Sequence, residues 1–238
     1  MFTYWAMMLS VAGMYTMYIT KIGFSKKEIS FTVTVFILSA LVGQNLFGYL
    51  ADRYRCVKKI LVICISIGII AAIALNLSSN KWLINVLIIM WGFCLYGTVP
   101  LSEAWYIEVL KNNGDQKEFG KIRGIGSIGY GASGIILGLL LQHFGWSIYC
   151  WYIIASACAI LLVILLIRES EDVTFYKGSG KVREGSTNIS FKEAFKLIIK
   201  IKPLRSTIII VFIYSFVLKG IYSYLGVLVS DFGGGPLS

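Results

Sequence analysis

FGKIRGIGSIGYGASGIILG, residues 119–138, predicts a membrane-spanning helix that extends over 119–142. At about 100° per residue, the small residues of this helix fall on one stripe. They are Gly120, Gly124, Ser127, Gly131, Gly134 and Gly138. Small residues let helices approach closely inside lipid. We therefore expect this stripe to pack against the backbone of a neighbouring helix.

Arg123 and Tyr130 lie beside the small residues, within about 60° of the stripe and two turns apart. A permanent charge on a membrane helix is costly, so it normally points into a protein cavity on a solute or ion path. The sequence thus predicts a packing face and an adjoining face that carries a cation and an aromatic ring. The alternative is a glycine-rich helix that only packs.

The composition indicates an all-α integral membrane protein. Of 238 residues, 57% are hydrophobic and 14% are charged, and the mean hydropathy is +0.77. Seven apolar runs are long enough to cross the bilayer as helices. They cover approximately 2–20, 29–51, 58–78, 82–110, 119–142, 145–168 and 205–229. No signal peptide is expected ahead of the first run.

The net charge of +10 follows the predicted topology. Of 22 Lys and Arg residues, four lie between the second and third runs, four between the fourth and fifth, and nine within 168–205. Basic residues concentrate in cytoplasmic loops. We therefore expect a multi-pass protein of the cell (plasma) membrane with a cytoplasmic N-terminus. The basic charge then indicates contact with anionic lipid in the bilayer, and no nucleic acid is expected as a partner.

Catalytic and metal-binding motifs are missing from the sequence. The five cysteines have no CxxC spacing, and we interpret them as small core residues. His143 is the only histidine, and no P-loop, HExxH, GxSxG or dinucleotide fingerprint occurs. We expect neither an enzyme nor a bound metal or cofactor.

The segment GQNLFGYLADRYRCVKKIL, residues 43–61, resembles the signature between helices 2 and 3 of the major facilitator superfamily. The matching residues are Gly48, Asp52, Arg53, Lys58 and Lys59. The resemblance implies a cytoplasmic gate, with close helix contact at the glycine and breakable charge pairs at the helix ends. An ordinary basic cytoplasmic loop is the alternative, but it does not explain the spacing of the glycine and the aspartate.

Two opposite charges are expected at similar depth on consecutive helices. Glu103 lies eight residues before Lys111, about 12 Å, and Arg123 lies six residues after Lys117, about 9 Å, at 1.5 Å per residue. A pair between them would lower the cost of burying either charge. The pair is either a purely structural salt bridge or part of a solute site. Glu108 is nearer the cytoplasmic end, where we expect it to be solvated.

The motifs around these charges resemble the lactose permease and its oligosaccharide:proton symporter relatives. They are Pro-x-x-Glu-Ala in the fourth run and Phe-Gly-x-x-Arg-x-x-Gly-x-x-Gly-aromatic in the fifth. The resemblance implies solute binding by Glu103, Arg123 and Tyr130, and Gly13-Met14-Tyr15 adds Tyr15. It implies uptake of a sugar-like or other small polar solute with a proton. Nucleoside and phenylpropionate transporters share the glycine-rich opening, so the substrate class stays open.

A proline is absent from residues 130–138, where drug and metabolite antiporters of the superfamily carry a glycine-proline signature. This absence favours uptake over efflux.

The resemblance implies three parts. Residues 1–168 form the six-helix N-terminal bundle, and 169–204 form a cytoplasmic central loop with an amphipathic helix. Residues 205–238 form the seventh helix and the start of an incomplete C-terminal half. Lys219 in this helix either faces a cavity or snorkels to the interface. A non-transporting fragment, or a half-transporter that needs a second half or a second copy, is the alternative function.

Overall fold

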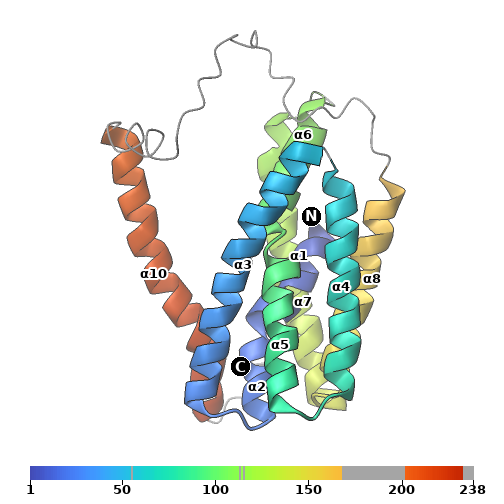
Figure 1. Ribbon diagram of the computed structural model, residues 1–238, viewed down its shortest axis with the longest axis vertical. Helices are drawn as coiled ribbons and strands as arrows, with labels where there is room; N and C mark the ends of the chain where they lie inside the picture. Colours follow the sequence, from blue (N-terminus) through green and yellow to red (C-terminus); the bar gives the residue numbers. More distant parts are fainter. Residues whose placement is uncertain (55, 113, 115, 168–201, 233–238) are drawn as a thin grey trace. The chain divides into compact units, whose positions relative to one another are not determined.

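The computed structural model describes residues 1–54, 56–112, 114, 116–167 and 202–232, which contain helices and no strands (Figure 1). Residues 1–175 and 226–238 form one compact unit, and residues 176–225 form another. The first unit holds α1 (Phe2–Met8), η1 (Leu9–Gly13), α2 (Tyr15–Lys21), α3 (Lys26–Tyr54), α4 (Val57–Leu77), α5 (Lys81–Trp91), η2 (Gly92–Tyr96), α6 (Val99–Asn112), η3 (Gln116–Glu118), α7 (Phe119–Phe144) and α8 (Ile148–Leu166). The remaining helix, α10 (Lys202–Asp231), begins in the second unit.

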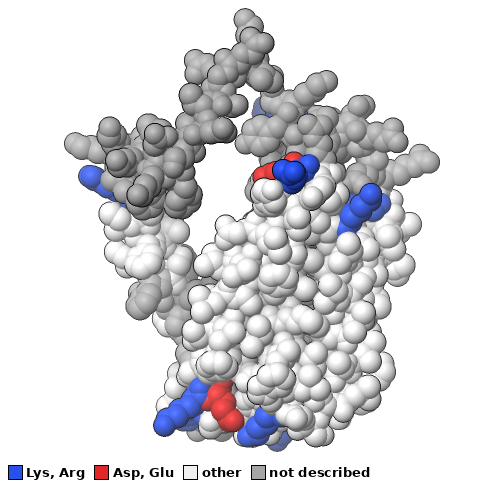
Figure 2. Space-filling view, in the orientation of Figure 1, with Lys and Arg blue, Asp and Glu red and all other residues white. Residues whose placement is uncertain are grey.

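Five segments of the described chain are long and apolar enough to span a membrane. They are Lys26–Tyr54, Val57–Leu77, Lys81–Lys111, Phe119–Phe144 and Ile148–Leu166, and they confirm five of the seven predicted runs. The first predicted run is divided into α1, η1 and α2. The seventh corresponds to α10, in which 205–215 is a shorter apolar segment. In Figure 2 the visible charged side chains of the bundle lie toward its two ends, with uncharged surface between them.

Two π-helical segments interrupt the first and the fourth predicted runs, which the sequence did not predict. In η1 the amide of Met14 bonds to the carbonyl of Leu9 at 3.2 Å, and in η2 the amide of Gly97 bonds to the carbonyl of Gly92 at 2.9 Å. These bonds join residues five apart, which is the π-helical pattern. The segments η1 and η2 pack against each other, so the two interruptions meet inside the bundle.

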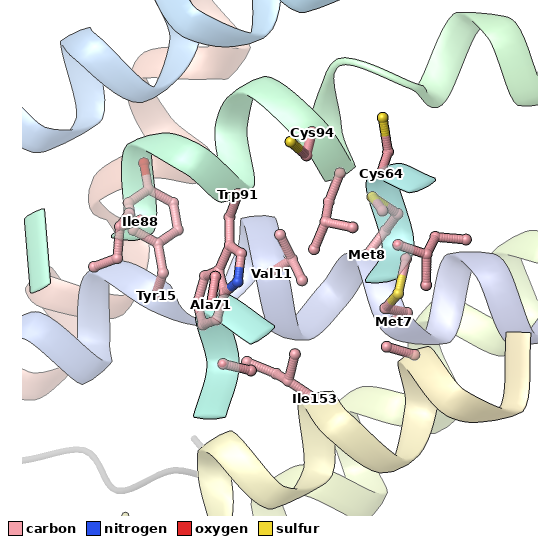
Figure 3. Close-up of a cluster of buried hydrophobic side chains, with 14 of the residues drawn as sticks. Met7, Met8, Val11, Tyr15, Cys64, Ala71, Ile88, Trp91, Cys94 and Ile153 are labelled. Carbon is pink, nitrogen blue, oxygen red and sulfur yellow. The ribbon is translucent and has the colours of Figure 1, made fainter. Parts of the chain in front are cut away.

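The core lies where α1, α4, η2 and α8 meet. Trp91 is fully buried there and donates from Nε1 to the carbonyl of Gly68 at 3.2 Å. Figure 3 shows Met7, Met8 and Val11 facing side chains from α4, η2 and α8. All five cysteines are free thiols, and three of them are buried as predicted, namely Cys64, Cys94 and Cys150.

The turn between α2 and α3 is tied to the start of α5. Ser25 and Glu28 form a reciprocal capping box, because each backbone amide bonds to the other residue's side chain at 2.7 and 3.3 Å. Lys81 donates to the carbonyl of Gly23 at 2.6 Å and lies 3.8 Å from the carboxylate of Glu28. Gly23 has a φ of 90°, a conformation that favours glycine.

The predicted packing stripe of α7 was wrong over residues 120–131, whereas at its C-terminal end Gly138 is buried and a Cβ on Gly134 would lie 3.4 Å from the side chain of Leu9. Gly120, Gly124, Ser127 and Gly131 are exposed in the part of the chain that the structure describes. A Cβ built on Gly120, Gly124 or Gly131 would meet no atom within 4 Å.

The closely packed face of α7 is instead formed by Gly126, Gly129 and Ser133, which are buried. A Cβ on Gly126 would lie 2.6 Å from the indole of Trp5, and one on Gly129 would lie 2.4 Å from the carbonyl oxygen of Phe2. This face lies about 150° around the helix from the predicted stripe. The spacing identified a helix with glycine faces, but it did not identify which face α1 covers.

Candidate functional site

Glu103 of α6 and Arg123 of α7 form an ion pair. Nε of Arg123 lies 3.1 Å from Oε1 of Glu103, which confirms the predicted pairing. The side chain of Glu103 is 32% exposed and that of Arg123 is 36% exposed. About a third of each side chain is therefore left uncovered by the described residues, where a polar solute could contact both groups.

The pair uses only one edge of each group. Among the described residues, the terminal nitrogens of Arg123 and Oε2 of Glu103 have no further hydrogen-bond partner. A guanidinium offers five N–H donors and a carboxylate about four acceptor positions. The arrangement thus keeps both a donor edge and an acceptor oxygen for hydroxyl groups of a solute.

Trp5 of α1 lies against this pair. The Cζ atom of Arg123 is 4.2 Å from the centre of the Trp5 ring, which is the geometry of a cation–π contact. Gly126 makes room for the indole, because a Cβ on this glycine would clash with it. Sequence reasoning missed Trp5, since its role depends on which face of α7 packs against α1. A glycine opposite an aromatic residue was the available signal.

Tyr130 stands on the other side of Trp5. The two ring centres are 6.4 Å apart and the ring planes are inclined by 62°, so they meet edge to face. The hydroxyl of Tyr130 reaches Gly13, the last residue of η1, where a Cβ would lie only 2.9 Å away. Arg123 and Tyr130 therefore both face α1, and Trp5 lies between them.

Tyr15, which the resemblance added to the site, is buried in α2. Its ring is stacked on Phe36 of α3, with 4.8 Å between the ring centres and 20° between the planes. One face of the ring is therefore covered by protein, and a role in solute binding stays a prediction.

The predicted gate residues lie at the end of α3 and the start of α4. A Cβ on Gly48 would meet no atom within 4 Å, so the close helix contact predicted at this glycine is not seen among the described residues. Gly43 makes such a contact instead, because a Cβ there would lie 2.4 Å from the carbonyl oxygen of Phe93. Asp52 and Arg53 are exposed and form no ion pair with described residues.

Lys58 contacts the end of α8. Its Nζ donates to the carbonyls of Ile167 at 2.6 Å and Leu165 at 3.3 Å. Carbonyls at a helix C-terminus have no partners within the helix and carry partial negative charge, so a lysine stabilises them. Lys59 is exposed. Lys58 thus ties α4 to α8, and a gate function of these residues stays a prediction.

Glu108 differs from its expected solvated state. Its Oε2 atom is buried and has no hydrogen-bond partner among the described residues. No group of three or more His, Cys, Asp or Glu within the described chain could hold a metal ion. The side chain of Lys219 lies outside the described residues, and so does the amphipathic helix predicted within 169–204, as far as residue 201.

Comparison with known proteins places the chain in a class of membrane transporters. The MFS_1 like family matches residues 1–234. An uncharacterised MFS-type transporter of Enterobacter sp. (strain 638) is 30% identical over 106 residues, which are 44% of this chain and 26% of that protein. The chain belongs to the MFS_1 like family of the major facilitator transporters.

The crystal structure of the nucleoside transporter NupG has a similar fold, with a TM-score of 0.61 and 23% identity over 91% of this chain and 51% of that one. A point mutant of NupG gives a TM-score of 0.67 and 21% identity over 94% of this chain and 54% of that one. This chain therefore spans about half the length of NupG.

Proposed function

We propose that this chain carries the solute site of a secondary transporter that takes up a small, hydroxylated, neutral solute together with a proton. The observation that carries the proposal is the ion pair of Glu103 and Arg123, which is about one-third exposed and has aromatic rings beside it. Carboxylate and guanidinium groups suit hydroxyls, and aromatic faces suit the C–H surface of a ring.

The charge of the site favours a neutral solute. Glu103 and Arg123 cancel each other at 3.1 Å, so hydroxyl groups can bridge them without leaving a net charge inside the membrane. An anion or a cation would leave one of the two groups uncompensated. Sugars and nucleosides both offer neighbouring hydroxyls on a ring. The fold is similar to that of a nucleoside transporter.

Alternating access is the proposed mechanism, in which two halves rock around a site near the middle of the membrane. Proton coupling is proposed from the resemblance to symporters and from the missing proline in 130–138. The second candidate is a half-transporter that needs another half or a second copy. The similarity to NupG covers about half of that protein.

Uptake into vesicles tests the proposal. Vesicles that contain the full chain are given labelled sugars and nucleosides, with and without an inward proton gradient. We expect uptake that rises with the gradient and that Arg123→Ala abolishes. The matched control is Lys121→Ala, because Lys121 is a cation of the same helix whose side chain is 77% exposed and pairs with Glu118.

Three outcomes separate the candidates. Uptake by the chain alone, lost only in Arg123→Ala, supports a carrier that assembles from copies of this chain. Uptake that appears only when a second half is co-expressed supports the half-transporter. Uptake that Arg123→Ala and Lys121→Ala leave equally intact rejects the proposed site.

A further inference from the structure

We propose that Trp5 is the aromatic wall of the solute site and holds Arg123 in position while the solute displaces Glu103. The inference rests on the proposed function and adds the selectivity of the site, namely a preference for hydroxylated solutes that contain a ring. The residue comes from α1, whereas the two charges come from α6 and α7.

The first argument is the geometry of the guanidinium. Arg123 bonds to Glu103 through Nε, at one edge of its plane, while Trp5 covers its face at 4.2 Å. A contact through the face uses none of the N–H donors, which all lie in the plane of the group. Trp5 therefore fixes Arg123 without competing with a solute for hydrogen bonds.

The second argument concerns exchange of partners. A solute hydroxyl that bonds to Glu103 or to Nε of Arg123 weakens the ion pair at 3.1 Å. Without a second contact, the long arginine side chain would then be free to change rotamer. The face contact with Trp5 remains during this exchange, so Arg123 stays oriented toward the solute.

The third argument is a hydrogen-bond donor of Trp5 that has no partner among the described residues. Nε1 of Trp5 is buried and has no hydrogen-bond partner among the described residues. It lies beside Gly126, where a Cβ would be 3.3 Å away. A buried donor without a partner is unusual in proteins. An oxygen of a bound solute would supply the missing acceptor close to the charged pair.

The rings around the pair set the preferred shape of the solute. The ring of Tyr130 meets the indole of Trp5 edge to face, with 62° between the planes, and the indole also lies against Gly126 of α7. An aromatic face binds a sugar ring through its C–H surface and a nucleobase through stacking. A linear polyol offers the same hydroxyls but no ring face.

Solute binding by the purified full chain tests the inference. We would compare wild type, Trp5→Phe, Trp5→Leu and the control Trp151→Phe, since Trp151 is 57% exposed on α8. The probes are a hexopyranoside, a nucleoside and a linear hexitol. We expect Trp5→Leu to weaken binding of the ring solutes about tenfold or more, as for loss of one stacking contact. Trp5→Phe should lose less than Trp5→Leu, because it keeps a ring face although it lacks the indole N–H. The hexitol should lose less affinity than the ring solutes in Trp5→Leu, because it has no ring to stack.

The possible results separate the inference from the proposed function. Equal loss for ring solutes and hexitol, or no loss in Trp5→Leu, overturns the inference alone. No binding of any probe by the wild type overturns the proposed function and the inference with it. A solute-free measurement covers variants that fold poorly: Arg123→Lys should shift the tryptophan emission of the wild type but not of Trp5→Phe. An equal shift in emission in the wild-type and Trp5→Phe backgrounds would contradict the contact between Arg123 and Trp5 and would also overturn the inference.

Discussion

The backbone of Gly129 in α7 touches the backbone of Phe2 in α1 so closely that a Cβ on the glycine would lie 2.4 Å from the phenylalanine carbonyl oxygen. A distance below 3.0 Å from a backbone atom requires the helices to move apart. The same helix pair presents Arg123 and Trp5 to each other. Close contact at Gly129 thus fixes the spacing of the candidate site.

Substituting Gly129 with alanine should therefore destabilise the bundle. We expect Gly129→Ala to lower the free energy of unfolding by about 1–3 kcal/mol, because overpacking displaces the α1 backbone. Thermal unfolding in detergent measures the effect. The control is Gly131→Ala on the same helix, where a Cβ meets no atom within 4 Å. Equal destabilisation by the two variants would contradict the observed packing face.

Ser133 links α7 to α1 and α8. Its hydroxyl donates to the carbonyl of Ala6 at 2.8 Å and lies 2.7 Å from the hydroxyl of Tyr152. We expect Ser133→Ala to cost about 1 kcal/mol, since the partly buried carbonyl of Ala6 and hydroxyl of Tyr152 each lose a partner. Ser127→Ala on the exposed side of the same helix should be neutral. Chemical denaturation of both variants checks the difference, and a neutral Ser133→Ala would show that these bonds add no net stability.

Substitution of Lys58 should lower stability more than substitution of Lys59, although both lysines belong to the same predicted gate motif. Lys58 bonds to two carbonyls at the end of α8, and its loss should cost about 1 kcal/mol. Lys59 is exposed, so Lys59→Ala should change stability little. Hydrogen exchange of the last turn of α8 reports the effect locally. Faster exchange in Lys59→Ala than in Lys58→Ala would contradict the assignment.

Substitutions at Glu103 and Arg123 test whether their ion pair serves only the stability of the fold or also solute binding. In a double-mutant cycle of Glu103→Gln and Arg123→Gln, we expect a coupling energy of about 1 kcal/mol, because both groups are about one-third exposed. The double variant should regain stability but not uptake, since the solute still lacks its charged partners. If the double variant regains both, the pair is purely structural.

Much of the fold could be predicted from hydropathy. Apolar length alone placed five membrane-spanning segments, and equal depth predicted the contact between Glu103 and Arg123. The depth of a residue along a membrane helix can be predicted, because the rise per residue is constant. Position around the helix is harder, since it depends on which neighbour covers which face. Glycines occur on both sides of α7, and only the partner helix distinguishes them.

The same limit explains the residues that were missed. Trp5 lies more than a hundred positions from Arg123 in the sequence, and no local pattern joins them. Lys58 was interpreted from its own loop, whereas its partners belong to the end of another helix. Both contacts are set by tertiary packing. Motif resemblance identified the charged residues of the candidate site but not the side chains that orient them.

The π-helical segments have a consequence for how this chain can gain or lose residues. Each segment holds one residue beyond what an α-helix would use, and the bulge absorbs the extra turn of about 100°. Deleting one residue within η1 or η2 would therefore leave the helices on either side facing their present neighbours. The same deletion in the middle of α4 would rotate everything beyond it away from the core. Single-residue length variation among relatives should thus concentrate at these two places, where the bundle already contains a spare residue.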